Sequence, residues 1–512
     1  MDEIVPGRWP ALDRTVLRSG YRPLALLIAA ASLAGLVALG ARTPAVFATA
    51  LLASAGAGLV VVLVPSRPVA AFGVLLVLAS MSGQTLDLSV GRVRLEQPAI
   101  IAAGVALILS RRWPRWVEVR PVSVIVLAFA AYLVVMVLSS ILFAPQITTS
   151  ARLLIWTAIS MCGGAVAFTL MVRLARGAEG WFTATGVLCS IVALAIAAVF
   201  LIAGPDGIPG MQLNRGEPPK VSGLAWEANL FASFLGAMAP FALEYFRTRA
   251  RARWATPAVL IVVALGLGVT RGAYIGLAAG LIVYLLALVI RSAVSRTSLR
   301  RVVAVIAIAA MLAPVGATIL LPGQRPSFLA TWYTSLVKPG PGPAGSGGPA
   351  GSGGPAGSGG TTPAPTPGPT PPTDTLEWRI DRLPTALNET KGSPIIGLGA
   401  ATFGQRHDIP GQPGRPDYLA ILAVVTLYES GILGTLALGV GMLLVLWMLF
   451  RASKFSPGPA AAFGGSLVSL LVAYESTNAL FFSFNWLIIG AALAFAVRTI
   501  RENSSPPEPA AS

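Results

Sequence analysis

Charged side chains are scarce in this sequence, and so are histidine and cysteine. Only 11% of the 512 residues are charged, against about 25% in a typical soluble protein. There is one histidine, His407, and the two cysteines, Cys162 and Cys189, lie inside apolar runs. The sequence therefore contains neither a disulfide framework nor a metal-ligand spacing. It also lacks a GxxxxGK[ST] phosphate loop and an Asp-x-Asp metal pair, so we expect no metal site and no cofactor.

Long apolar runs take up most of the chain. Hydrophobic residues make up 55% of it, and the mean hydropathy is +0.75. Since about 20 apolar residues suffice for one helical crossing of a bilayer, the sequence predicts an all-α, polytopic integral membrane protein with about 12 to 14 transmembrane helices and one large extracytoplasmic loop. The predicted spans are 24–41, 45–64, 68–82, 98–110, 121–143, 152–172, 181–203, 226–246, 256–270, 272–290, 302–321, 419–449, 459–480 and 485–499.

The distribution of arginine predicts which loops face the cytoplasm. The net charge is +16, but the arginines gather in short loops between apolar runs. That pattern is typical of the positive-inside rule rather than of nucleic-acid binding. It predicts a multi-pass protein of the inner (plasma) membrane with both termini cytoplasmic. The tails are 1–23 and 501–512, the membrane helices occupy 24–321 and 419–500, and residues 322–418 lie outside.

The outer segment divides into two parts by composition. Residues 322–375 are rich in Pro, Gly and Ser and contain PAGSGG three times. Such a segment cannot bury a core, so we interpret it as an insertion. Residues 376–418 form a long polar stretch in which WRIDRLPTAL predicts a short amphipathic helix over 378–387. We therefore expect the functional loop at 376–418.

Positive charges on the outer side are informative because they oppose the topology bias. Arg271 stands between two apolar runs with almost no loop. An ionisable group at that boundary is a functional candidate, although an arginine that reaches to lipid headgroups is the simpler alternative. Guanidinium and ammonium groups at this depth suit a lipid-linked phosphate or pyrophosphate. The further binding candidates are Arg215, Lys220, Arg379 and Arg382, whereas one face of a short hairpin explains Arg92 and Arg94.

Four segments, in order along the chain, carry a resemblance to a known family. They are KVSGLAWEANLFASFLGAMAP with Lys220, VTRGAYIGLAAG with Arg271, EWRIDRLPTALNETKGSPIIGLGAATFG with its Pro-x-x-Gly-x-Gly turn, and DYLAILAVVTLYESGILG with Glu429. Across these segments the chain resembles the O-antigen ligase and polysaccharide polymerase superfamily of bacterial membrane glycosyltransferases.

The resemblance implies a metal-independent glycosyltransferase that acts outside the membrane. Its donor would be a glycan on undecaprenyl pyrophosphate, its acceptor a glycan or a lipid, and its surroundings the lipid bilayer, with no nucleic acid involved. Ligases usually carry His-Asn shortly before the last segment, where this sequence has Pro416-Asp417, and Lys220 stands where arginine is usual. The choice between ligase and polymerase therefore stays open, and so does the choice of base between Asp417 and His407.

Each candidate also has a structural alternative. Glycosyl transfer with inversion needs a base beside the acceptor hydroxyl and positive charge beside the leaving pyrophosphate, and we expect Arg271 to supply that charge. His407 could instead be a solvated loop residue, and Asp417 an N-cap on the span that begins near 419. Glu429 could bind substrate or pair inside the protein.

Two other functions compete with the transferase. A transporter or flippase of a lipid-linked sugar is the alternative, because about 14 spans suit such proteins. The sequence contains no internal repeat, however, and its polar residues concentrate on one side of the membrane. A structural scaffold would leave Arg271 unexplained.

Overall fold

The computed structural model of the chain covers most of the predicted helices and the polar loop from Arg379 onward. The described residues are 30–32, 34–35, 44–81, 85–88, 91–110, 120–172, 178–203, 213–214, 220–221, 225, 227–249, 251–268, 270–291, 295–320, 379–409, 412–417, 419–477 and 479–504. The predicted insertion at 322–375, most of the span 24–41 and Arg215 lie outside them.

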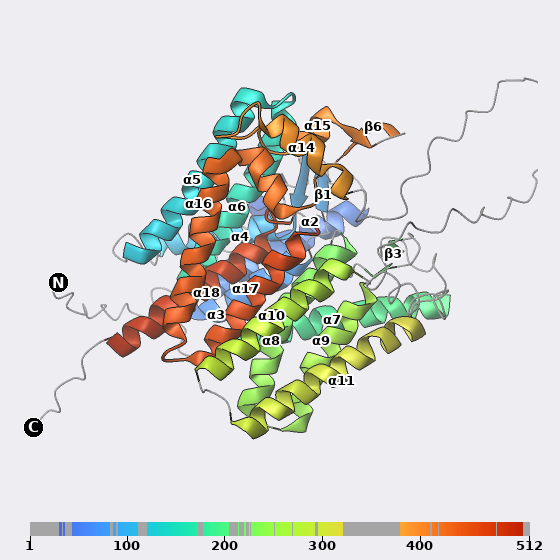
Figure 1. Cartoon of the computed structure of the whole chain (residues 1–512), viewed down its shortest axis with the longest axis vertical. Coiled ribbons are helices and arrows are strands. Elements are labelled where there is room, and N and C mark those ends of the chain that lie inside the picture. The colour runs from blue at the N-terminus through green and yellow to red at the C-terminus, as the bar shows by residue number, and fades with distance from the viewer. Residues whose placement is uncertain are drawn as a thin grey trace, which may run out of the picture.

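The described chain is a bundle of helices with three short antiparallel hairpins (Figure 1). The helices are α2 (Pro44–Ser66), α3 (Pro68–Ser80), α4 (Glu96–Leu109), α5 (Arg120–Phe143), α6 (Ile147–Met171), α7 (Ala178–Ala203), α8 (Ala228–Arg249), α9 (Thr256–Leu267), α10 (Arg271–Ile290), α11 (Arg296–Leu320), α14 (Leu383–Thr390), α15 (Phe403–Arg406), α16 (Leu422–Ala452), α17 (Pro457–Tyr474) and α18 (Ser483–Ser504). The hairpins pair β1 (Thr85–Leu88) with β2 (Gly91–Arg94), β3 (Leu213–Asn214) with β4 (Lys220–Val221), and β5 (Asp408–Ile409) with β6 (Gln412–Pro416).

Most of these helices are suited to a membrane. Among the described residues, nine helices are long and apolar enough to cross a bilayer, and three shorter apolar segments lie at Pro68–Ser80, Glu96–Leu109 and Ala252–Leu267. α8 is a further helix, buried along most of its length. The structure therefore confirms the predicted class, an all-α polytopic membrane protein.

Helices approach one another closely where small residues face each other. α10 crosses α17 at Gly276, where an added methyl group would lie 2.5 Å from the carbonyl oxygen of Ser469. α6 crosses α18 at Gly164, where it would lie 2.9 Å from the carbonyl oxygen of Trp486. Such approach lets backbones make van der Waals contact, which is a main source of helix association in lipid.

The segment 379–417 covers one end of the bundle, which we call the loop end. α14, α15 and β6 lie together there (Figure 1). The N-terminus of α10 meets the C-terminus of α17 at this end, because Gly272 packs directly on Ser476. The N-terminus of α16 joins them through the Ala423 N–H, which donates to the Glu475 carboxylate at 3.4 Å.

At the opposite end of the bundle, arginine side chains form hydrogen bonds within and between helices. Arg247 donates from two nitrogens to the fully buried Glu244 carboxylate, each at 2.7 Å, and the Tyr284 hydroxyl donates to the same group at 3.1 Å. Arg291 donates to the Ser453 hydroxyl at 3.0 Å and so ties α10 to the end of α16. The two ends of the bundle therefore differ in chemistry.

Candidate functional site

A break in α16 organises the loop end. Gly431 has φ 63° and ψ −168°, so the helical path is interrupted there. The segment 394–399 fills the break. Four backbone hydrogen bonds join them: Leu398 N to Tyr428 O (2.7 Å), Gly399 N to Glu429 O (3.0 Å), Ile432 N to Pro394 O (2.8 Å) and Leu433 N to Ile395 O (3.0 Å).

Glycine is required on both sides of this contact. Gly397 and Gly399 have φ of 78° and 99°, values that residues with a side chain rarely adopt. A methyl group on Gly399 would lie 2.8 Å from the Cα atom of Ser140 on α5. The sequence GLGAATFG therefore forms the tight turn that it predicts, and the turn brings the loop into contact with the membrane helices.

Glu429 pairs inside the protein and holds this turn. Its carboxylate accepts a hydrogen bond from the Ala401 N–H at 2.8 Å, and only 8% of the residue is exposed. Ser139 of α5 donates to the Glu429 carbonyl at 2.9 Å, and Ser150 of α6 donates to the Ala400 carbonyl at 2.6 Å. The contacts of Glu429 thus match the structural alternative, while its binding of substrate stays a prediction.

Asp417 pairs with Arg382 across the loop end. The Arg382 Nε donates to Oδ2 of Asp417 at 2.6 Å, and Asp417 is only 2% exposed. The structural alternative, in which Asp417 caps the following span, does not hold, because α16 begins only at Leu422 and its N-cap is Ile421. Asp417 instead fixes β6 to the start of α14. Its role as a base stays a prediction.

Glu389, near the end of α14, contacts three side chains of the loop end, and the sequence analysis does not identify it. Its Oε1 lies 2.6 Å from Nε2 of His407, and its Oε2 accepts the Tyr428 hydroxyl at 2.6 Å. Arg406 lies 3.9 Å from the same carboxylate. A neutral imidazole that donates from Nε2 to Glu389 leaves Nδ1 as an acceptor. His407 is therefore an oriented, 30% exposed group rather than a freely solvated one.

Arg379 lies beside the start of α8. Burial raises the pKa of Glu227, the residue before α8, and the positive charge of Arg379 opposes that rise. The same stretch of α8 contacts the chain just ahead of α10, since a methyl group on Gly268 would lie 2.9 Å from the Ala232 side chain. Arg379 and the chain just ahead of Arg271 therefore both lie near the first turns of α8.

Arg271 is the first residue of α10 and is exposed. Its neighbour Thr270, the N-cap, makes no capping hydrogen bond with its side chain. The Thr270 hydroxyl is buried and has no hydrogen-bond partner among the described residues. The N-terminus of a helix carries unpaired N–H groups and a partial positive charge. Arg271 therefore stands at a place suited to an anion.

The other predicted cations are less defined. Lys220 lies on β4 opposite Asn214, and its side chain is outside the described residues, as is Arg215. The predicted hairpin is present, since Arg92 pairs with Asp87 and Arg94 with Thr85 along β1 and β2.

The environment of Arg94 differs from the prediction, which places this residue on the surface of a hairpin. It is fully buried, its guanidinium lies over the rings of Trp156 (4.3 Å) and Phe482 (4.0 Å), and it donates to the Phe481 carbonyl at 3.2 Å. Burial lowers the pKa of Arg94 to about 10, and the charge of Glu96 opposes the drop, so the group is charged at neutral pH. The ring of Phe481 lies 5.0 Å from the same guanidinium, and these three aromatic rings, far away in sequence, explain the burial, which no local pattern indicates.

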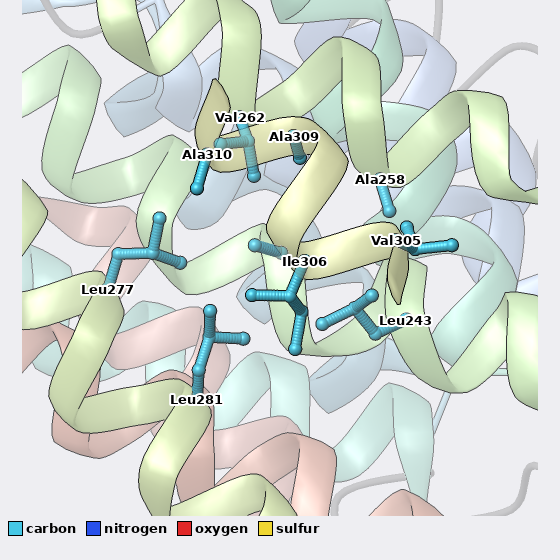
Figure 2. A pocket seen from close by; sticks show the side chains of 10 residues that line it. Leu243, Ala258, Val262, Leu277, Leu281, Val305, Ile306, Ala309 and Ala310 are labelled. Atoms are coloured by element: carbon cyan, nitrogen blue, oxygen red, sulfur yellow. The ribbon is translucent and has the colours of Figure 1, made fainter. Parts of the chain in front are cut away.

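A small cavity between α8, α9, α10 and α11 has no part in this site. Figure 2 shows its lining, which includes Leu243, Val262, Leu277, Leu281 and Ile306 and is apolar throughout. Its volume is about 50 Å³. Without a polar side chain it can neither bind a charged group nor move a proton.

The structure therefore brings Arg271, Arg379, Arg382, Asp417 and His407 to one end of the bundle. Within the described residues, no group of three His, Cys, Asp or Glu side chains is arranged to hold a metal ion. No model of a known protein family matches the sequence, and no curated protein matches it either.

Proposed function

We propose that this membrane protein is a glycosyltransferase that acts outside the cytoplasm and needs no metal ion. In this proposal it takes a glycan from undecaprenyl pyrophosphate and joins or polymerises it onto a glycan or lipid acceptor. One observation carries the proposal. An exposed arginine, Arg271, begins α10 at the end of the bundle where the loop 379–417 holds further cations and carboxylates.

The charge of the opposite end supports this orientation. Arg247, Arg291 and Arg451 lie at the ends of α8, α10 and α16 there. An excess of arginine marks cytoplasmic loops. The loop end then faces outward from the inner (plasma) membrane, with both chain termini cytoplasmic.

The chemistry follows from the cations. When the glycan leaves the donor, negative charge grows on the pyrophosphate, so a positive group there acts more strongly in the transition state than in the bound donor. Arg271 and the N–H groups at the start of α10 supply this interaction. Arg379, Arg382, Lys220 and Arg215 are the further binding groups, and Asp417 and His407 are the candidate bases.

The alternative function is a transporter or flippase of a lipid-linked sugar. Its best support is the broken helix α16, because discontinuous helices often build transport sites. In this chain, however, the segment 394–399 occupies the break with four hydrogen bonds. The break then serves to anchor the loop, which favours the transferase.

Replacement of Arg271 tests the proposal. We expect Arg271→Ala to lower transfer by about 10²–10³-fold, the usual loss for one such donor. Arg271→Lys should recover little, because an ammonium cannot bind two pyrophosphate oxygens in a fixed plane. The assay is in vitro transfer from a defined undecaprenyl-pyrophosphate glycan, with variants matched for membrane abundance.

Arg296→Ala is the matched control. Arg296 is also an exposed arginine at the first position of a helix, α11, but it lies at the opposite end. This variant should keep wild-type turnover. Near wild-type turnover in Arg271→Ala would contradict the proposal and favour the transporter.

A further inference from the structure

The turn between α17 and α18, residues 475–482, is held more firmly than a connecting loop requires. Three consecutive carbonyls each accept a side-chain donor from elsewhere in the bundle. They are Ala479 O from Asn485 Nδ2 (2.6 Å), Leu480 O from Trp486 Nε1 (2.8 Å), and Phe481 O from Ser160 Oγ (2.9 Å) and Arg94 Nη1 (3.2 Å). The buried Arg94 therefore helps to fix the conformation of this turn.

The first residues of the turn lie against the two helix N-termini of the loop end. Ser476 touches the backbone of Gly272, where a methyl group would lie 2.6 Å from the Ser476 Cβ atom. Glu475 accepts the N–H of Ala423 in the first turn of α16. Glu475 and Arg271 each directly precede a residue of the contact between Ser476 and Gly272. The backbone positions of this acidic residue and this basic residue, on different helices, therefore lie close together at the loop end.

We infer that Glu475 is the carboxylate that takes the proton from the acceptor hydroxyl in the transfer reaction. This inference rests on the proposed function and names the base of that same site. Glu475 is exposed at the loop end, and its one described partner is a backbone N–H at a long 3.4 Å. It can therefore meet an acceptor without breaking a stronger interaction.

The step balances without a further reactant. The acceptor oxygen forms a bond to the anomeric carbon as its proton passes to the Glu475 carboxylate. The bond from that carbon to the pyrophosphate oxygen breaks, and its electron pair stays on the pyrophosphate beside Arg271. The product is a new glycosidic bond, free undecaprenyl pyrophosphate and a protonated Glu475, which loses its proton to water.

Of the two bases suggested by the sequence, Asp417 is less available than Glu475, because it is 2% exposed and bound to Arg382 at 2.6 Å. His407 contacts Glu389 through Nε2 at 2.6 Å and keeps Nδ1 as an acceptor, so it is the competing base. Partial burial raises the pKa of Glu475, and its bond from the Ala423 N–H opposes the rise, which makes it a stronger base than an ordinary carboxylate. The facing first turn of α10 contributes Arg271 and Tyr274, and that of α16 has no titratable side chain.

Glu475→Gln separates this role from a structural one. The amide oxygen of glutamine still accepts the Ala423 N–H, but it cannot take up a proton at neutral pH. We expect kcat for transfer to fall about 10²–10⁴-fold, while inhibition by undecaprenyl pyrophosphate, which reports binding at Arg271, changes less than about threefold. Glu502→Gln, at an exposed carboxylate near the C-terminus of α18, is the control and should behave as wild type.

Each outcome of these measurements either supports or overturns the assignment of Glu475 as the base. Normal kcat in Glu475→Gln overturns the assignment of the base and leaves the proposed function standing. If Glu475→Gln loses both undecaprenyl-pyrophosphate binding and turnover, the role of Glu475 is structural, and the assignment of the base is overturned as well. A wild-type protein without transfer from any undecaprenyl-pyrophosphate glycan overturns the proposed function, and this inference with it.

Discussion

Gly431→Ala tests whether the break in α16 holds the loop end together. Gly431 has φ 63° and ψ −168°, a region that is essentially restricted to glycine, and a side chain there costs about 1–3 kcal/mol. The added methyl group would also lie 2.5 Å from the backbone nitrogen of Gly397, and backbone atoms of Ile395 are nearest to it. Backbone atoms cannot rotate away, so the segment 394–399 has to move.

The magnitude follows from the bonds that such movement breaks. Moving the segment away from α16 breaks at least the hydrogen bonds donated by Ile432 and Leu433. Each is worth about 0.5–1.5 kcal/mol. The backbone strain and the two lost hydrogen bonds together give an expected loss of about 2–6 kcal/mol in the free energy of docking this segment.

Gly439→Ala is the matched control on the same helix, because a methyl group at Gly439 meets nothing within 4 Å. Alanine is favoured over glycine inside a helix by up to about 1 kcal/mol, so this variant should be neutral or stabilising. The assays are thermal unfolding in detergent and hydrogen exchange of the Leu398 and Gly399 amides. Equal stability and equal exchange in the two variants would refute the reasoning.

Two further predictions concern the loop. Deletion of the three PAGSGG repeats should leave transfer within a few-fold of wild type, because the cost of loop closure changes by only about 0.6 kcal/mol per doubling of length; complete loss in a correctly inserted protein would contradict the interpretation as an insertion. Arg382→Ala should lower the free energy of unfolding by about 3 kcal/mol, the lower end for breaking a buried ion pair, because it leaves the charge of Asp417 buried and unpaired. Adding Asp417→Asn should restore part of that loss in thermal unfolding, and a double variant as unstable as the sum of the two single variants would argue against the pairing.

The fold class could be predicted from the sequence because spans depend on local composition. A run of about 20 apolar residues is a membrane helix almost regardless of its neighbours. The ends of the helices are harder to predict than their existence. The predicted span 459–480 includes Glu475, whereas α17 ends at Tyr474. The prediction therefore assigns Glu475 to the membrane helix, although it lies in the turn that follows.

The candidate site could be predicted only in part, because its pairs join distant positions. The sequence marks Arg271, Asp417 and His407 as unusual, but no local pattern indicates that Arg382 meets Asp417 or that Glu389 meets His407. The sequence predicts a hairpin surface for Arg94, because nothing nearby in the chain indicates the rings of Trp156 and Phe482. One signal was available for Glu475, namely a single acidic residue between two apolar runs.

The break in α16 has a consequence for the biogenesis of the protein. A helix that enters a membrane normally brings all of its backbone hydrogen bonds with it, but the N–H groups of Ile432 and Leu433 find their acceptors in Pro394 and Ile395. An unpaired backbone group in lipid costs several kcal/mol, so these two N–H groups favour docking of the preceding loop against α16. The assembly of the last membrane helices is therefore coupled to the assembly of the candidate site.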